Sequence, residues 1–161
     1  MQVPFKSQVR SVEESWIDYN GHMNVTFYTK AFDIAVDEFL ESEIGIGPSS
    51  VKSTQKGSFA LQTQYRYLRE LQVNESFFIE TFVADYSEKQ IHLMLIMKKC
   101  DTEALIASCE TILLNVDLNE RKSSSYEVKE IGKITELFDS AEVLRSTISM
   151  GHSIGLRKSR D

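Results

Sequence analysis

Apolar residues recur every three or four positions between residues 24 and 43, which predicts one long amphipathic helix. One stripe of this helix consists of Tyr28, Ala31, Phe32, Ala35 and Phe39. Ile34, Val36 and Leu40 widen the stripe, so more of the helix should be buried than in a surface helix. Glycines at positions 45 and 47, followed by a proline, predict where the helix ends.

The chain on either side of this helix has the pattern of β-strands. A strand is predicted ahead of the helix over residues 5–14, and four more follow it over 59–71, 76–86, 90–100 and 104–117. The turns between the last four runs are too short for crossover helices, so these strands form an antiparallel meander. The helix must therefore pack on a face of that sheet.

The run from 90 to 100 is apolar on both of its faces. One face carries Ile91, Leu93, Leu95 and Met97, and the other carries His92, Met94 and Ile96. A single sheet covered by one helix would leave one face wet and would alternate more cleanly. We therefore expect a second subunit to cover part of the other face or to join the sheet edge.

The composition changes after residue 117. Residues 119–125 form a polar linker, and the apolar spacing from 131 to 138 predicts a short amphipathic helix. We accordingly divide the chain into a main domain, residues 1–120, and a C-terminal extension, residues 121–161, whose short helix packs on the same domain.

Composition narrows the class of protein. A chain of 161 residues with 42% hydrophobic and 26% charged residues fits one globular domain, and a net charge of −6 argues against nucleic acid as a partner. No run has the length of a membrane span, and the first residues lack the apolar core of a signal peptide. We expect a cytoplasmic protein with no membrane partner.

The two cysteines, Cys100 and Cys109, flank a predicted hairpin turn. Pairing about that turn sets Cys100 near Leu105 and Cys109 near Ile96, an offset of about 13 Å that is too long for a disulfide. Both should be free thiols. The sequence has no metal-ligand spacing and no Gly-rich phosphate loop, so we expect neither a metal nor a cofactor.

The polar residues with the clearest chemistry lie just ahead of the long helix. They are Asp18, Asn20, Gly21, His22 and Asn24. The first N–H groups of a helix lack internal partners, and its dipole places partial positive charge there, so that negative charge on a carbonyl oxygen would be stabilised. Asp18 could attack the same carbonyl or activate a water. A plain turn and helix cap explains these residue types equally well.

The string Asp-Tyr-Asn-Gly-His-Met-Asn, followed by a helix, resembles the hotdog-fold acyl-CoA thioesterases of the 4-hydroxybenzoyl-CoA thioesterase type. The resemblance covers about residues 5 to 120. It implies an α+β hotdog fold, in which an antiparallel five- to six-stranded sheet wraps around one long central helix. It also implies a homodimer or homotetramer that hydrolyses acyl-CoA to a free carboxylate and CoA.

The same resemblance assigns roles to individual residues. Asp18 matches the catalytic carboxylate, acting as nucleophile or general base, and the backbone N–H groups from Met23 to Val25 match the oxyanion site. The backbone of Gly21 could approach closely and assist. His22 either orients water or braces the loop, and Asn24 serves more as an N-cap than in the chemistry.

A second cluster lies at the end of the strand over 59–71. The family often ends this strand with an aromatic-x-x-Glu pattern, so Tyr67 and Glu70 are candidate substrate-binding residues, and Glu70 would reach the neighbouring subunit's site. Arg66 is a candidate partner for the CoA phosphates. The family usually has Gly-Asp after the strand, and its absence here puts the placement of Glu70 in doubt.

A narrower resemblance concerns the acyl group. Residues 16–25, with Phe-Asp-x-Ala-x-Asp at 32–37, resemble thioesterases of carnitine breakdown that hydrolyse betainyl-CoA. A quaternary ammonium group requires an aromatic box, for which the candidates are Trp16, Tyr19, Tyr28 and Tyr67. Aromatic residues at these spacings are more often part of a core, and a generic short or medium acyl-CoA is the leading expectation.

Two other functions stay open at this point. A hotdog hydratase or dehydratase also uses an Asp and a His ahead of the helix, but usually with a proline between them and wider spacing. A non-enzymatic acyl-CoA-binding protein would keep the pocket and could dispense with Asp18.

Overall fold

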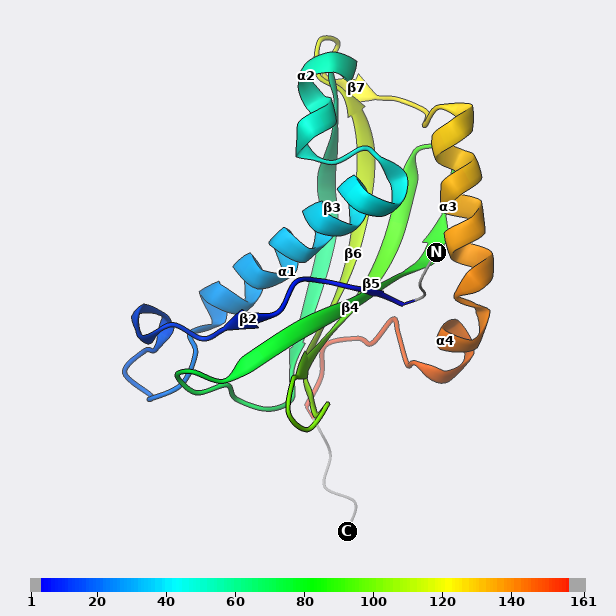
Figure 1. The fold of residues 1–161 in the computed structure, drawn as a ribbon. Coiled ribbons are helices and arrows are strands. Elements are labelled where there is room, and N and C mark those ends of the chain that lie inside the picture. The colour runs from blue at the N-terminus through cyan, green and yellow to red at the C-terminus, as the bar shows by residue number, and fades with distance from the viewer. Residues whose placement is uncertain (1–3, 157–161) are drawn as a thin grey trace.

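The computed structural model describes residues 4–156 and is organised around helix α1 (Val25–Phe39), which lies across one face of an antiparallel sheet (Figure 1). The strand order is β1-β4-β5-β6-β3, with β2 also paired to β4 and β7 to β6. The bounds are β1 (Phe5–Lys6), β2 (Arg10–Ser11), β3 (Lys56–Tyr67), β4 (Ser76–Tyr86), β5 (Gln90–Lys99), β6 (Leu105–Asp117) and β7 (Lys122–Ser123).

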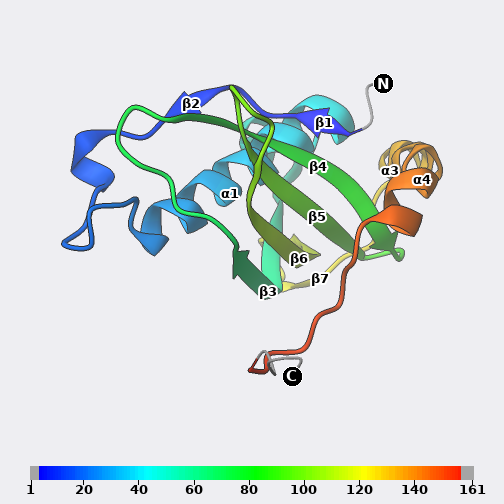
Figure 2. The same ribbon diagram turned by 90° about the horizontal axis from the view of Figure 1, so that it is seen from below.

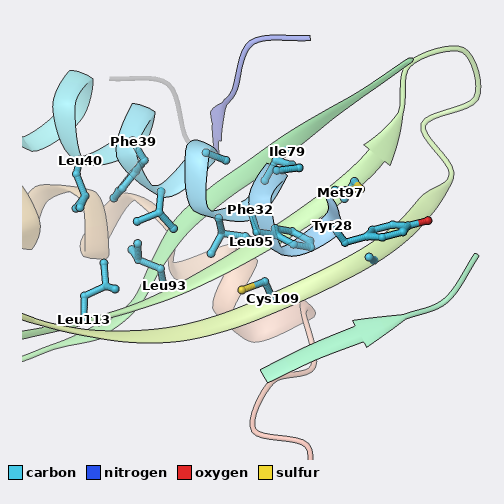
Figure 3. Close-up of a cluster of buried hydrophobic side chains, with 14 of the residues drawn as sticks. Tyr28, Phe32, Phe39, Leu40, Ile79, Leu93, Leu95, Met97, Cys109 and Leu113 are labelled. Atoms are coloured by element: carbon cyan, nitrogen blue, oxygen red, sulfur yellow. The ribbon is translucent and has the colours of Figure 1, made fainter. Parts of the chain in front are cut away.

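The core lies between α1 and this face of the sheet (Figure 3). The helix buries the predicted stripe, Tyr28, Ala31, Phe32, Ala35, Val36 and Phe39. The sheet contributes side chains that share one face by strand alternation, among them Ile79, Leu93, Leu95, Met97 and Leu113. Burying a large apolar side chain stabilises a fold by about 1.5–3 kcal/mol, so these contacts hold α1 in place.

The predicted first strand is interrupted. It forms two short strands, β1 and β2, both antiparallel to β4, and then a 3₁₀ turn at Glu14–Trp16. Ser7 lies at the break, where its hydroxyl accepts a hydrogen bond from the N–H of Ile79 at 2.9 Å. A side-chain oxygen therefore replaces the backbone carbonyl that a continuous ladder would use.

Helix α1 ends where the glycines predict. It continues into a π-helical turn, Leu40–Ile44, and stops at Gly45, whose φ of 87° is left-handed. A 3₁₀ turn (Pro48–Ser50) and the short helix α2 (Val51–Thr54) then lead into β3. In the part of the chain that the structure describes, no helix is both long and apolar enough to cross a membrane.

Both cysteines are free, as the offset predicts. The register differs from expectation because the hairpin turn begins one residue earlier: the N–H of Lys99 donates to the carbonyl of Ala104, and Lys98 lies opposite Leu105. A shift between Met97 and Lys98 then leaves Cys109 opposite Leu95, one residue from the expected Ile96. Burial raises the pKa of the Cys109 thiol to about 12, so this thiol stays protonated and unreactive at neutral pH.

The second face of the sheet is partly covered by the chain itself. Helix α3 (Val128–Ser140) closes the end of the main core with Ile134 and Leu137, and α4 (Glu142–Thr147) follows it (Figure 2). The outward-facing side chains of Phe82, Ala84, Met94 and Ile96 pack with Ala141, Leu144, Ile148 and Met150. The chain itself therefore covers this part of the outer face, and the expectation of a second subunit stays a prediction for the rest of the face and for the sheet edge.

Two glycines give a matched test of how closely the segment after α1 packs on the π-helical turn. A Cβ at Gly47 would lie 2.6 Å from the Cβ of Glu41, whereas one at Gly132, inside α3, would meet nothing within 4 Å. Gly47→Ala should lower the free energy of unfolding by about 1–3 kcal/mol through overpacking. Gly132→Ala should raise it by about 0.5–1 kcal/mol through helix propensity. Urea unfolding at one protein concentration measures both, and equal stability of Gly47→Ala and wild type would contradict the close approach.

Candidate active site

The loop ahead of α1 is folded tightly on itself. Ile17 and Met23 form an isolated antiparallel bridge, and the N–H of Asp18 donates to the carbonyl of His22 at 3.1 Å. The N–H of Gly21 donates back to the carbonyl of Asp18 at 3.0 Å, with Gly21 at a φ of 81°. A glycine adopts this left-handed conformation without steric cost, so the Asn-Gly pair makes the turn.

The Asp18 carboxylate is held by two hydrogen bonds from within the same segment. Its Oδ1 accepts from the N–H of Asn20 at 2.8 Å, and its Oδ2 accepts from Nδ2 of Asn24 at 3.2 Å. The Oδ1 of Asn24 accepts from the N–H of Thr26 at 2.9 Å and so caps α1. Asn24 therefore joins the carboxylate to the start of the helix.

The backbone N–H groups near the helix start are not equally available. The N–H of Met23 donates to the carbonyl of Leu71 at 2.8 Å, and that of Asn24 to the carbonyl of Trp16 at 2.9 Å. The N–H of Gly21 is also engaged, as described above. Among the residues that the structure describes, no acceptor meets the N–H of Val25. Of the three oxyanion candidates, Gly21, Met23 and Val25, only Val25 has an N–H group to offer a substrate.

A pocket of about 260 Å³ opens beside Val25. Its walls are His22, Met23, Val25, Tyr28 and the segment from Tyr67 to Glu70. The hydroxyl of Tyr28 accepts from the N–H of Leu71 at 3.0 Å, and this bond, with the one from Met23 to Leu71, fixes the segment after β3 against the loop. Asp18 is not part of this wall. Its hydrogen-bond partner Asn24 lies in the chain between two wall residues, Met23 and Val25.

The remaining polar candidates are placed as follows. His22 is half-buried, and its Nδ1 lies 3.1 Å from the carbonyl oxygen of Met23, a position that braces the loop. Glu70 lies at the pocket wall and accepts from Nε2 of Gln72 at 3.3 Å. Arg66 is excluded from this pocket, because neighbouring residues of a strand alternate and Arg66 shares the outer face of the sheet with Gln64.

The predicted aromatic box is only half present. Tyr19 is 96% exposed, and Trp16 stacks on Phe27 at 5.2 Å beside a different pocket, which Arg10 and Lys30 also line. Tyr28 and Tyr67 do meet, edge to face at 5.4 Å. The structure thus separates Trp16 and Tyr19 from the other two candidates.

Two aromatic residues outside the predicted box complete the cluster. Tyr65 stacks on Tyr67 at 6.3 Å, and Phe32 lies 5.8 Å from Tyr65. Their spacing was a usable signal, because Phe32 is one helical turn from Tyr28 and Tyr65 shares a strand face with Tyr67. Burial raises the pKa of Tyr65 and of Tyr67, so both phenols are neutral near pH 7.

This aromatic cluster runs from the pocket into a groove of about 470 Å³ between α1 and β3. Phe32, Asp33, Tyr65, Cys109 and Leu113 are among its lining residues, and Lys30 lies at the same groove. Asp33 is exposed and is the carboxylate of this groove. In the described part of the chain, no three His, Cys, Asp or Glu side chains are grouped closely enough to bind a metal ion.

Comparison with known proteins now decides the family. Residues 12–139 match the thioesterase-like superfamily. The chain belongs to this superfamily. It is a thioester hydrolase, and the match extends beyond residue 120, where the resemblance seen in the sequence ended. The predictions of family, of hotdog fold and of thioesterase activity are confirmed.

Named relatives point in the same direction. A betainyl-CoA thioesterase of Pseudomonas aeruginosa is 24% identical over 88% of each chain. An L-carnitine dehydrogenase/betainyl-CoA thioesterase of Ruegeria pomeroyi is 34% identical over 74% of this chain, which spans only 24% of that longer protein. This chain therefore corresponds to about a quarter of the bifunctional relative.

Solved structures establish the fold independently. A hypothetical protein of Staphylococcus aureus in complex with CoA superimposes with a TM-score of 0.84 at 24% identity, covering 95% of both chains. A putative thioesterase of Pseudomonas putida gives a TM-score of 0.81 at 23% identity, covering 98% of this chain and all of the other. At these identities the similarity concerns the fold alone.

Asn24 has two tasks in this site, and two substitutions separate them. Asn24→Ala removes both the cap and the hydrogen bond to Asp18, and should lower the free energy of unfolding by about 1 kcal/mol. Asn24→Asp keeps a capping oxygen but loses the amide donor and brings a like charge to Asp18. The free energy of unfolding of Asn24→Asp should therefore stay within about 0.5 kcal/mol of the wild-type value. Chemical unfolding of both variants tests this, and equal losses would mean that the cap is not what Asn24 supplies.

Proposed function

We propose that this thioesterase hydrolyses an acyl-CoA, with the N–H of Val25 holding the carbonyl oxygen and Asp18 as the catalytic carboxylate. Asp18 either attacks the carbonyl carbon or takes a proton from the attacking water. The C–S bond then breaks, and CoA leaves as a thiolate that takes up a proton. If an acyl-aspartyl anhydride forms, a water hydrolyses it and releases the carboxylate.

The observation that carries this proposal is how the hydrogen bonds at the helix start are distributed. Neighbouring N–H groups are bound within the protein, whereas Val25, whose N–H has no acceptor among the described residues, lines a pocket. An N–H that points at developing negative charge in a site fixed before reaction contributes about 3–4 kcal/mol to transition-state stabilisation. Asn24 hydrogen-bonds both to the first turn of the helix and to Asp18, and so holds the carboxylate next to the helix start.

The site also supports a homodimer formed through β3. This strand is the edge of the sheet, is 12 residues long, and exposes Phe59, Leu61 and Tyr67 by 39%, 53% and 47%. A long exposed edge strand with apolar side chains is a pairing surface. A second copy along β3 would close the groove and bring its own Glu70 towards the site. Coverage of the outer face by α4 favours a dimer over a tetramer built through that face.

For the acyl group we propose a short chain that ends in a cation, as in betainyl-CoA. The support is the groove itself, where neutral aromatic rings of Phe32 and Tyr65 lie with the carboxylate of Asp33. Aromatic faces and a carboxylate are the usual surroundings of a quaternary ammonium group. The names of the relatives agree with this choice. A neutral short or medium acyl group is the alternative, which the same aromatic walls would accept.

We place the enzyme in the cytoplasm. The support is that both cysteines are free thiols, the usual state in a reducing compartment. Fractionation of the source cells with an antibody against the chain would test this placement.

Asp18→Asn provides the direct test of the chemistry. An amide cannot act as a base or a useful nucleophile, so kcat should fall by at least about 100-fold. It still offers one oxygen to the hydrogen bonds that Asp18 accepts, so the variant should fold. Thiol release from short, medium, long, aromatic and betainyl-CoA measures the rate.

Asp139→Asn, at the end of α3, is the matched control for loss of one carboxylate and should keep the wild-type rate. A folded Asp18→Asn variant with full activity would remove Asp18 from the mechanism. Binding of acyl-CoA without turnover by the wild-type protein would replace the proposal by a binding function.

Asp33→Asn tests the charge of the acyl group. The substrates are betainyl-CoA and 3,3-dimethylbutyryl-CoA, which has the same shape but carries carbon in place of the charged nitrogen. Loss of the carboxylate should lower kcat/KM for betainyl-CoA by about tenfold and leave the neutral analogue almost unchanged, since about 1.4 kcal/mol corresponds to a factor of ten. An equal effect on both substrates would show that Asp33 does not recognise a cation.

A further inference from the structure

The C-terminal strap, defined here as residues 148–156, crosses the outer face of the sheet. It leaves α4, passes under β5 and β6, and ends below β3, the edge strand (Figure 2). Ile148 and Met150 begin it and pack against the outward patch that includes Met94 and Ile96. The strap is therefore attached at its start by apolar contacts.

Hydrogen bonds then fix the strap at the sheet edge. The N–H of Gly151 donates to both carboxylate oxygens of Glu110, at 3.0 and 2.8 Å, and Nε2 of His92 lies 3.1 Å from the same carboxylate. The Nε2 of Gln64, on β3, donates to the carbonyl of His152 at 2.6 Å. These bonds join residues 41 and 88 positions apart in the chain, so the strap has a defined course as far as β3.

Beyond that point its groups lack partners among the described residues. The Nε2 of His152 is buried with no hydrogen bond, beside a pocket of about 300 Å³ that Gln62 and Ser153 also line. Ile154 and Leu156 are 96% and 98% exposed. Each would gain about 1.5–3 kcal/mol from full burial, so two such side chains at the edge of a sheet indicate a surface that another chain covers.

The position of the strap on β3 indicates which chain that is. Gln62 and Gln64 lie near the middle of the free edge strand, over which the strap passes. When two copies of β3 pair antiparallel about a two-fold axis, residues near the middle of each strand face each other. Both straps then arrive on the same face, at the seam between the two sheets.

We propose that the strap is an arm that crosses this seam and packs Ile154 and Leu156 on the outer sheet face of a second copy. The proposal rests on the β3 dimer proposed above. From Ser153 to Leu156 an extended chain spans about 10 Å, the width of about two strand spacings. That reach ends over β6 of the second copy, whose half-buried outward residues Ile112 and Leu114 form the receiving surface. His152 enters the seam with its unpartnered nitrogen.

The first experiment compares two pairs of charge substitutions by dilution of the full chain in sedimentation velocity. Ile154→Asp with Leu156→Asp should raise the dissociation constant of the dimer at least about tenfold by removing two apolar contacts. The control pair, Val128→Asp with Val143→Asp, changes two exposed apolar residues on α3 and α4, which are 91% and 72% exposed. This pair should leave the dissociation constant unchanged. Circular dichroism checks that both variants fold.

The second experiment places a thiol at the seam. In a Cys100→Ser background, Ser153→Cys should give covalent dimers with a short bis-maleimide, because two copies of residue 153 meet there. Ser140→Cys, at the end of α3, should not. Suppose that the wild type is a dimer, that the charge substitutions in the strap do not weaken it, and that Ser153→Cys does not cross-link. The proposed arm is then wrong, and the proposed β3 dimer is unaffected. A monomeric wild type overturns both.

Discussion

The hydrogen bonding of the first turn of α1 is the constraint on which the rest of the site depends. A helix start has several N–H groups without internal partners, and each needs an acceptor or water. Here the carbonyl of Trp16 accepts from the N–H of Asn24, and the side chain and carbonyl of Asn24 accept from the N–H groups of Thr26 and Phe27. The N–H of Val25 is the one left without an acceptor among the described residues. The loop, the end of β3 and the helix cap together therefore fix the position of this donor.

That arrangement holds only because α1 cannot shift along the sheet. Phe32 and Phe39 are almost fully buried, and a slip of the helix along its axis would expose one of them or open a cavity. The hydroxyl of Tyr28, from the same buried stripe, accepts from the backbone of Leu71. Core packing thus reaches the site directly through one side chain, which ties the helix to the wall of the pocket.

The sequence predicted much of the fold because its strongest signals are local. The stripe from Tyr28 to Phe39, the left-handed Gly45 and the short turns of the meander each follow from residues close together in the chain. The break at Ser7 could not be predicted in this way, since it depends on Ile79 across the sheet. The one-residue register error at Cys109 has a different cause, a hairpin turn that begins one residue earlier than its residue types indicate.

The site was predicted from a sequence motif, and this explains which of its features the prediction missed. The loop from Asp18 to Val25 came from a contiguous string, but the string did not indicate which N–H groups the protein itself uses. Arg66 and Tyr67 were both assigned to the substrate, but neighbours on a strand face opposite sides, so only Tyr67 lines this pocket. A contact of Arg66 with the CoA phosphates stays a prediction. Tyr65 was missed because no motif includes it, and Phe32 was missed because it was assigned to the buried stripe of the helix, although it also begins the string at 32–37. Strand and helical periodicity placed both next to residues already chosen.

The apolar outer face of β5 had two physical solutions, coverage by another subunit or by the chain itself. Residues 141–150 supply the second, and they cover the β4–β5 side of the face while leaving β3 bare. The consequence is an uneven protomer, in which the β4–β5 side of the sheet is covered and the other side ends in the open strand β3. The groove proposed for the acyl group lies between α1 and this strand, so in the proposed dimer a second chain would supply its last wall. The proposed assembly and the proposed substrate recognition therefore depend on the same edge.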